Sequence, residues 1–113
     1  MTTTPKVLIH AKYAESAETT QYPLTAADSV RTALDKFTAH NATASNATLT
    51  VRLVKSGGAA GAANIVAAKV IPPGRTETLP ELVGHILEAG DFISTLCSAA
   101  SAVVIRASGR QIT

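Results

Sequence analysis

The sequence predicts an all-β domain, an antiparallel β-sandwich of jelly-roll type with seven to eight strands. Three observations support this fold class. Turn signals recur about every 8–12 residues in the C-terminal half, the spacing that is typical of sandwiches. Threonine and β-branched residues flank most apolar runs, which favours strands despite the many alanines. Between the expected strands, no stretch has the length of a crossover helix.

The N-terminal strands are expected at 6–11 and 19–24. The first is a compact apolar run that follows Pro5. The second contains Pro23, which cannot donate to a ladder, so this strand is expected to lie at an edge or to end there. Residues 25–29 are expected to form a turn.

The segment 30–40 fits two alternatives. As an amphipathic helix it would place Ala33, Leu34 and Phe37 on one face. We favour a strand, because its neighbours are β and Asn41 closes it. A strand here would carry four residues on one face, namely Thr32, Leu34, Lys36 and Thr38.

The strongest strand signal lies at 48–54, where Leu49, Val51 and Leu53 alternate with polar residues. Residues 41–46 connect it to the preceding strand. Pro80 and Gly84 bracket one expected helical turn, since proline suits a first helical position and glycine a stop. The remaining expected elements are the loop 56–63, the strand 64–71, the turn 72–75, a short segment through 78–79, and strands at 85–87, 92–97 and 102–108 with turns at 88–91 and 98–101.

Length and charge limit the classes of protein. The 113 residues suit a single domain over 1–113, and the sequence leaves open whether residues 1–5 form an extended N-terminal arm. A net charge of +2 with scattered cations argues against nucleic-acid and membrane-surface binding. No apolar stretch is long enough for a transmembrane helix. The single cysteine, Cys97, excludes an intrachain disulfide and fits a reducing cytosol.

No catalytic, cofactor or metal site is expected, and we predict that the protein is not an enzyme. The glycine-rich loop lacks the lysine and hydroxyl of a phosphate-binding P-loop. The three histidines, His10, His40 and His85, have no metal-ligand spacing. Cys97 has the surroundings of a core thiol. Glu88 and Asp91 bracket a turn, where the short Asp91 side chain is expected to bond backbone amides.

Two groups of residues are candidates for interactions instead. Gly57, Gly58 and Gly61 form a small-residue loop that could lie flat against a partner or become ordered on binding. Tyr13 and Tyr22 could stack on a sugar ring, which would suit a receptor- or glycan-binding sandwich. The low charge density agrees with a surface that is buried in an assembly.

A resemblance extends over nearly the whole chain, and its motifs are mostly turn and strand signatures. They are Thr19 to Tyr22, Asp35 to Ala39, Leu49 to Val54 before Ser56-Gly57-Gly58, Ile71 to Gly74, Pro80 to Gly84, Leu87 to Ser94 and Arg106 to Arg110. In this order they resemble a group of small structural proteins of tailed bacteriophages and prophages. The chain departs from that pattern at 24–28, where the group has a proline.

The resemblance implies a non-enzymatic virion protein, made in the bacterial host cytoplasm. The expected role is capsid decoration or cement, in which many copies bridge neighbouring capsid subunits. Expected partners are other copies of the chain, as a dimer or trimer, and the major capsid protein or another virion protein. A neck, tail or fibre-associated module and a receptor- or glycan-binding sandwich are the alternatives. The resemblance supplies no site residues.

Overall fold

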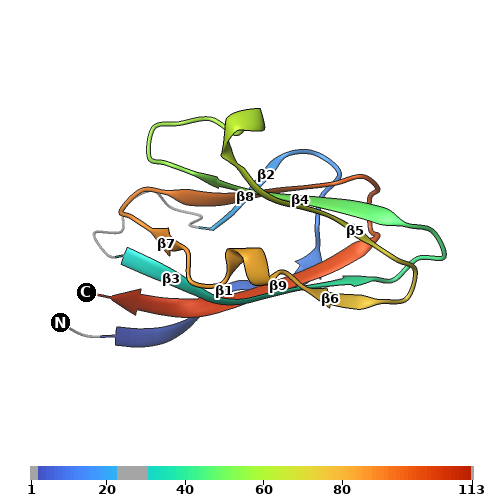
Figure 1. The fold of residues 1–113 in the computed structure, drawn as a ribbon, viewed down its shortest axis with the longest axis horizontal. Helices are drawn as coiled ribbons and strands as arrows, with labels where there is room; N and C mark the ends of the chain where they lie inside the picture. Colours follow the sequence, from blue (N-terminus) through green and yellow to red (C-terminus); the bar gives the residue numbers. More distant parts are fainter. Residues whose placement is uncertain (1–2, 23–30, 113) are drawn as a thin grey trace.

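The computed structural model describes residues 3–22 and 31–112, which form two antiparallel sheets that face each other (Figure 1). Sheet A has five strands in the order β1-β9-β3-β6, with β7 also paired to β3, and sheet B has four in the order β2-β8-β4-β5. The predicted all-β antiparallel sandwich is therefore confirmed. The strand bounds in sheet A are β1 (Thr3–Tyr13), β3 (Arg31–Asn41), β6 (Thr76–Thr78), β7 (Ile86–Leu87) and β9 (Val103–Ile112). Those in sheet B are β2 (Thr19–Tyr22), β4 (Ala47–Val54), β5 (Ile65–Ile71) and β8 (Phe92–Cys97).

The topology is that of a jelly roll. The chain changes sheet at every connection between consecutive strands except β4 to β5 and β6 to β7. When β6 and β7 are counted as one strand position, each sheet has four positions. β9 in sheet A and β8 in sheet B then both occupy the second position, between the strands β1 and β3 and between β2 and β4. This arrangement wraps two Greek keys around one core, as in jelly-roll domains.

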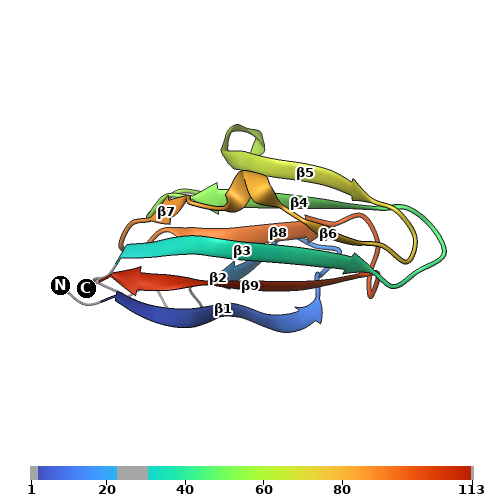
Figure 2. The same cartoon turned by 60° about the horizontal axis from the view of Figure 1, so that its bottom comes forward.

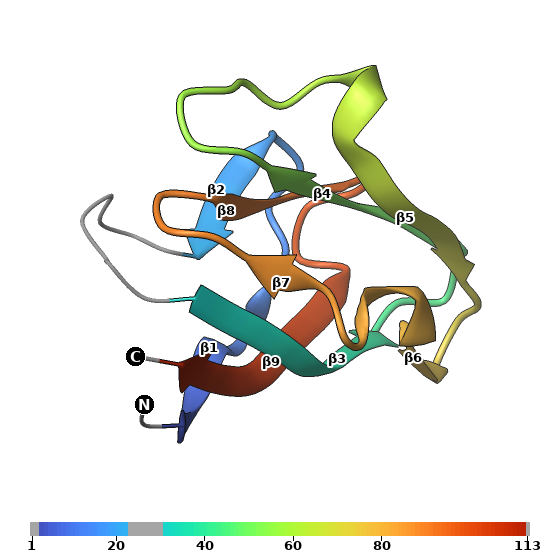
Figure 3. The same ribbon diagram turned by 60° about the vertical axis from the view of Figure 1, so that its left-hand side comes forward.

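The described residues contain nine strands rather than seven to eight, because one strand position is broken. β6 pairs with the end of β3, and β7 pairs with its beginning. Between them the 3-10 helix η2 (Pro80–Leu82) forms the predicted helical turn and buries Leu82 in the core. The backbone stays bonded to β3 on both sides of η2, since the Leu79 N–H donates to Phe37 O (3.0 Å) and the Gly84 N–H to Leu34 O (2.8 Å). Figure 3 shows this broken edge beside β3.

The strand alternative for 30–40 is confirmed by β3, but its expected faces are wrong. A bulge at Asp35 shifts the pairing of β3 with β9 between Leu34 and Lys36. The side chains of Leu34 and Phe37 therefore both enter the core, whereas Lys36 points outward. An extra residue in one strand reverses the faces of everything beyond it.

The core lies between the sheets and consists mainly of apolar side chains. Leu49 and Val51 of β4 are completely buried and face Phe37 and Ile105 of sheet A within one cluster. Leu53, the third residue of the alternating face, is only partly buried against that cluster. The same alternation turns Thr48 and Thr50 toward the outer face of sheet B, and it ends before Val54, which is buried.

The first and last described residues are also held by strand pairing. Residues 3–5, which the sequence analysis considered as part of an arm, begin β1 and pair with β9, with Thr3 opposite Ile112. β2 lies at the edge of sheet B and ends at Tyr22, and the expected turn at 25–29 lies outside the described residues. Within the described part of the chain, no helix has the length and apolar character needed to cross a membrane.

Candidate functional site

The outer face of sheet A carries two neighbouring cations that have no ion-pair partner among the described residues, Lys36 and Arg106. β9 lies between β3 and β1 along this face (Figure 2). Two cross-strand pairs stand side by side on it, Lys36 opposite Ser108 and Thr38 opposite Arg106. The bulge at Asp35 produces this arrangement, because it turns Lys36 and Thr38 together onto the face that carries Arg106 and Ser108.

These four residues line a shallow hollow of about 240 Å³, which we call the basic hollow. The Lys36 and Arg106 side chains are exposed, and neither forms an ion pair within the described residues. Their positions are diagonal across two paired strands, where Cβ atoms are roughly 7–8 Å apart. A single oxyanion could therefore accept hydrogen bonds from both cations and from the hydroxyls between them.

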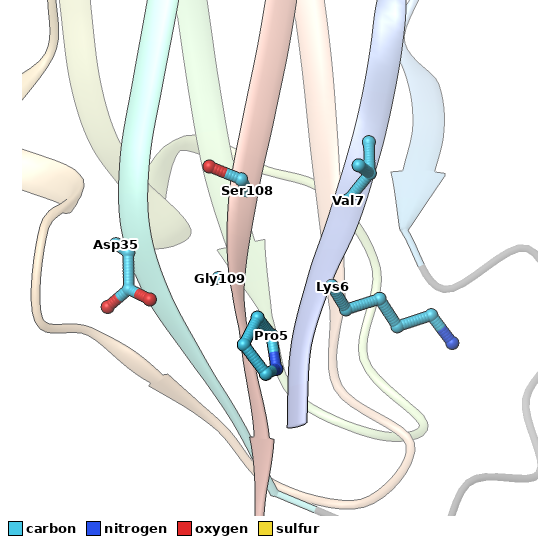
Figure 4. Close-up of a pocket in the computed structure, with 6 residues that line it drawn as sticks. All are labelled: Pro5, Lys6, Val7, Asp35, Ser108 and Gly109. Carbon is cyan, nitrogen blue, oxygen red and sulfur yellow. The ribbon is translucent and has the colours of Figure 1, made fainter. Parts of the chain in front are cut away.

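A second hollow of about 330 Å³ adjoins the first and shares Ser108 with it. Figure 4 shows its lining across three strands, with the Ser108 hydroxyl directed toward β3 and Lys6 extending away from the other labelled residues. Gly109 is essential to this region: a Cβ atom there would lie 2.0 Å from the carbonyl oxygen of Ala33. The close approach of β9 to β3 thus requires glycine.

An ion pair bounds the second hollow. The Arg110 Nε–H is shared between both carboxylate oxygens of Asp35, at 3.1 and 3.0 Å. The hydrogen bonds and charge of Asp35 raise the pKa of Arg110 above its ordinary value. Because this pair neutralises itself, Lys36 and Arg106 dominate the local field. Neither hollow places a nucleophile beside a base, so what the lining offers chemically is binding of an anionic group.

The outer face of sheet B is very different. Its paired outward residues include Thr50 opposite Ala68 and Thr48 opposite Val70, and Val70 is 53% exposed. Its charges are confined to one end, where Arg52 pairs with Glu18. The face is otherwise built from hydroxyl, methyl and small apolar side chains.

The three predicted loop glycines lie near the β4 end of sheet B, away from the basic hollow. Gly57 has a φ of 79°, which glycine adopts without strain, and the Gly58 N–H donates to Lys55 O in a turn. Gly61 O accepts a hydrogen bond from Arg52 Nε (2.9 Å), and the Gly61 N–H donates to Asn64 Oδ1 (3.0 Å). The loop is exposed at Gly57 and Gly58 and half-buried at Gly61, and its contact with a partner stays a prediction.

The two candidate tyrosines do not share an exposed surface. Tyr22 is only 8% exposed and belongs to the core cluster. Its hydroxyl accepts a hydrogen bond from Gln111 Nε2 (2.7 Å) and bonds Thr32 Oγ1 (3.3 Å). Tyr13 is half exposed at the end of β1. The structure therefore leaves one of the two rings available to a ligand.

The remaining titratable candidates occupy separate places. His40 Nδ1 bonds Thr76 Oγ1 (2.7 Å), whereas His10 lies on β1 and His85 beside β7. No three metal-ligating side chains converge within the described ranges. Cys97 is buried on β8, as expected of a core thiol.

The predicted turn role of Asp91 is confirmed. Its Oδ2 accepts the Glu88 N–H, and its Oδ1 accepts the Ser56 N–H from the glycine-rich loop, both at 2.9 Å. The carboxylate thereby joins two loops.

Sequence reasoning missed the basic hollow. In the sequence, Arg106 is one of several scattered cations, and Lys36 is one residue on the expected face of a strand. Thr38 and Arg106, which face each other across it, are 68 positions apart. The pairing of two distant strands and the bulge at Asp35 decide this juxtaposition, and neither leaves a local signal.

Comparisons with known proteins support the fold only. No protein-family model matches this sequence, and no curated protein matches it. A solved structure, from work described as "Bacillus endospore appendages form a novel family of disulfide-linked pili", is similar with a TM-score of 0.56 and 15% sequence identity. The match covers 99% of this chain and 88% of that one. At this identity the likeness extends to the β-sandwich architecture of a structural appendage protein, and it carries no sign of a tailed-bacteriophage origin.

Proposed function

We propose that this protein is a non-enzymatic structural subunit that acts in many copies through protein–protein contacts. The observation that carries the proposal is the pair of unlike outer faces on a closed jelly roll, one with free cations and one almost free of charge. The two hollows on sheet A, and a third on sheet B that Thr48, Thr50 and Leu96 help to line, are shallow and offer no reacting pair of side chains. Surfaces of this kind suit repeated contacts better than enclosure of a substrate.

More specifically, we propose a tailed-bacteriophage virion protein that decorates or cements the capsid. The sequence motifs from Thr19 to Arg110 support this role. The partners would be other copies, as a dimer or trimer, and the major capsid protein or another virion protein. Each copy would add a modest interface, and multivalent bridging would make the shell resist internal pressure. A neck, tail or fibre position is the alternative within the same class.

A filament subunit is a second candidate, favoured by the likeness to the appendage structure. The work on that appendage describes disulfide-linked pili, whereas Cys97 here is only 2% exposed. A filament of this chain would therefore be held by noncovalent contacts unless β8 opened. A glycan-binding role is less well supported, because Tyr22 is committed to the core.

Quantitative mass spectrometry of purified virions tests the leading proposal. A copy number comparable with that of the major capsid protein is expected for decoration, and a few copies would move the protein to the neck, tail or fibre. Absence from virions would overturn the virion proposal. Electron microscopy of the purified protein, with and without reductant, tests the filament. Reductant-insensitive filaments would support it, and dispersed particles would reject it.

A further inference from the structure

In the basic hollow, no carboxylate of the described residues pairs with Lys36 or Arg106. Lys36 and Arg106 place several N–H donors and two positive charges beside two hydroxyls. Thr38 Oγ1 reaches only the Arg106 carbonyl, at 3.5 Å. Like charges held close on neighbouring strands repel each other, so a carboxylate between them would relieve this repulsion.

An inventory of the described carboxylates shows which of them could supply the missing acceptor. Four are ion-paired to a lysine or arginine, and Asp91 accepts two backbone amides. The two without a side-chain or amide partner are Glu77, which is half-buried on β6, and Glu81, which is exposed on η2. The four ion-paired carboxylates are Glu15, Glu18, Asp35 and Glu88.

Glu81 stands on a rigid, partly apolar ridge. Leu82 is fully buried beneath it, and the Val83 N–H donates to Pro80 O (3.1 Å), which closes the turn. Val83 and Ile86 beside it are 51% and 47% exposed. We call Glu81, Val83 and Ile86 the η2 ridge. The buried Leu82 and the Pro80–Val83 hydrogen bond hold the backbone of η2 in place, so binding would order little backbone there, and the exposed Val83 and Ile86 would gain apolar contact.

We propose that the basic hollow of one copy receives the Glu81 carboxylate of a second copy of this chain. The inference rests on the proposed function, because it requires that copies meet. Val7, which borders the adjoining hollow, would face the apolar part of the η2 ridge. The two surfaces are different, so the contact is heterologous, and each copy can both donate a ridge and accept one. Such a contact builds a ring or an open chain rather than a simple two-fold dimer.

Charge-reversal variants test this contact. One variant carries Lys36→Glu and Arg106→Glu, and the other carries Glu81→Lys. Sedimentation velocity at low salt should show self-association of the wild type and a weakening of roughly tenfold or more in each variant alone. An equimolar mixture of the two variants should recover association, because each reversed hollow then meets a reversed ridge. Association of the wild type should also weaken at about 0.5 M salt.

Lys55→Glu is the matched control, since Lys55 is an exposed cation in a loop of sheet B and should leave association unchanged. Circular dichroism checks that each variant folds, and Lys36→Ala with Arg106→Ala replaces the reversal if it does not. Unchanged association in both reversal variants, or no recovery in the mixture, would overturn the inference. So would a wild type that stays monomeric at about 1 mM. The copy number in virions tests the proposed function separately from this contact. Many copies per virion together with association that the charge reversals do not change would reject the contact but leave the proposed function standing.

Discussion

The outer faces of the two sheets share one core but differ in chemistry. Sheet A presents Lys36, Arg106 and the Asp35–Arg110 pair, whereas sheet B presents threonine, alanine and valine with charge at one end. Contacts through the first face would depend on salt, because exposed charges are screened within about 8 Å at physiological ionic strength. Contacts through the second would depend on shape and area. The two faces of one jelly roll thus suit different kinds of contact.

The largest expected effect comes from Gly109, which supports the charged face. In Gly109→Ala the new Cβ would lie 2.0 Å from Ala33 O and 3.0 Å from Leu8 Cδ1, so β9 must move away from β3. We expect a loss of about 3 kcal/mol in the free energy of unfolding, measured by urea denaturation. Gly61→Ala is the control, because its nearest neighbour is 4.0 Å away, and it should change stability by less than about 0.5 kcal/mol. Equal midpoints for the two variants would contradict this account.

Asn41 lies where the chain leaves sheet A for sheet B, and it holds the two together. Its Nδ2 donates to Ser45 O (2.7 Å) and Ile71 O (2.8 Å), and its Oδ1 accepts the Thr43 N–H (2.9 Å). Asn41→Ala leaves these backbone groups without partners and should cost about 2–3 kcal/mol of unfolding free energy, measured by thermal and urea denaturation. Asn46→Ala, at an exposed asparagine followed by the same two residue types, should be nearly neutral. If both variants lose the same unfolding free energy, the side-chain hydrogen bonds of Asn41 do not stabilise the connection between the two sheets.

The ion pairs on the two faces allow a direct comparison of their environments. Arg52 and Glu18 on sheet B have side chains 14% and 29% exposed, against 46% and 41% for Arg110 and Asp35 on sheet A. We expect Arg52→Ala to cost about 1–2 kcal/mol, since it also removes the bond to Gly61 O. Arg110→Ala should cost less than Arg52→Ala, because water and salt screen the exposed Arg110–Asp35 pair, and it should lose that cost at high salt. Urea denaturation at two salt concentrations measures both, and the reverse order of costs would contradict the burial argument.

The smallest effect concerns Glu15, on the connection from β1 of sheet A to β2 of sheet B. The hydrogen bond from Lys12 lowers the pKa of Glu15 below its ordinary value of 4.5, against a smaller opposing effect of burial. A carboxyl whose pKa is lowered by folding contributes stability above its unfolded pKa and loses it as the pH falls through the folded value. The wild type should therefore lose more thermal stability than Glu15→Gln between about pH 5 and 3. Lys12→Met should likewise reduce the dependence of the melting temperature on pH over this range. If the melting temperatures of all three proteins fall in parallel with pH, the Lys12–Glu15 hydrogen bond does not lower the pKa of Glu15.

Local chemistry determined the elements of this protein from the sequence alone. The alternation at Leu49 and Val51 predicted β4, Asn41 marked the end of β3, and Pro80 with Gly84 predicted the turn that became η2. The turn role of Asp91 was equally predictable, because its first partner is three positions away. These features depend on neighbours in the chain, so the sequence contains their cause directly.

Tertiary structure decided the features that depend on distant partners. The bulge at Asp35 reversed the faces of β3, and the break at η2 turned one strand position into two, so the strand count and the outward position of Lys36 could not be derived from the sequence. The basic hollow exists only because β3 lies against β9, and the burial of Tyr22 depends on Gln111, 89 positions away. A pairing register shifted by one residue leaves every local signal unchanged but exchanges the buried and exposed side chains. For that reason the sequence determined which segments are strands, and only the pairing of β3 with β9 determined that Lys36 and Arg106 meet.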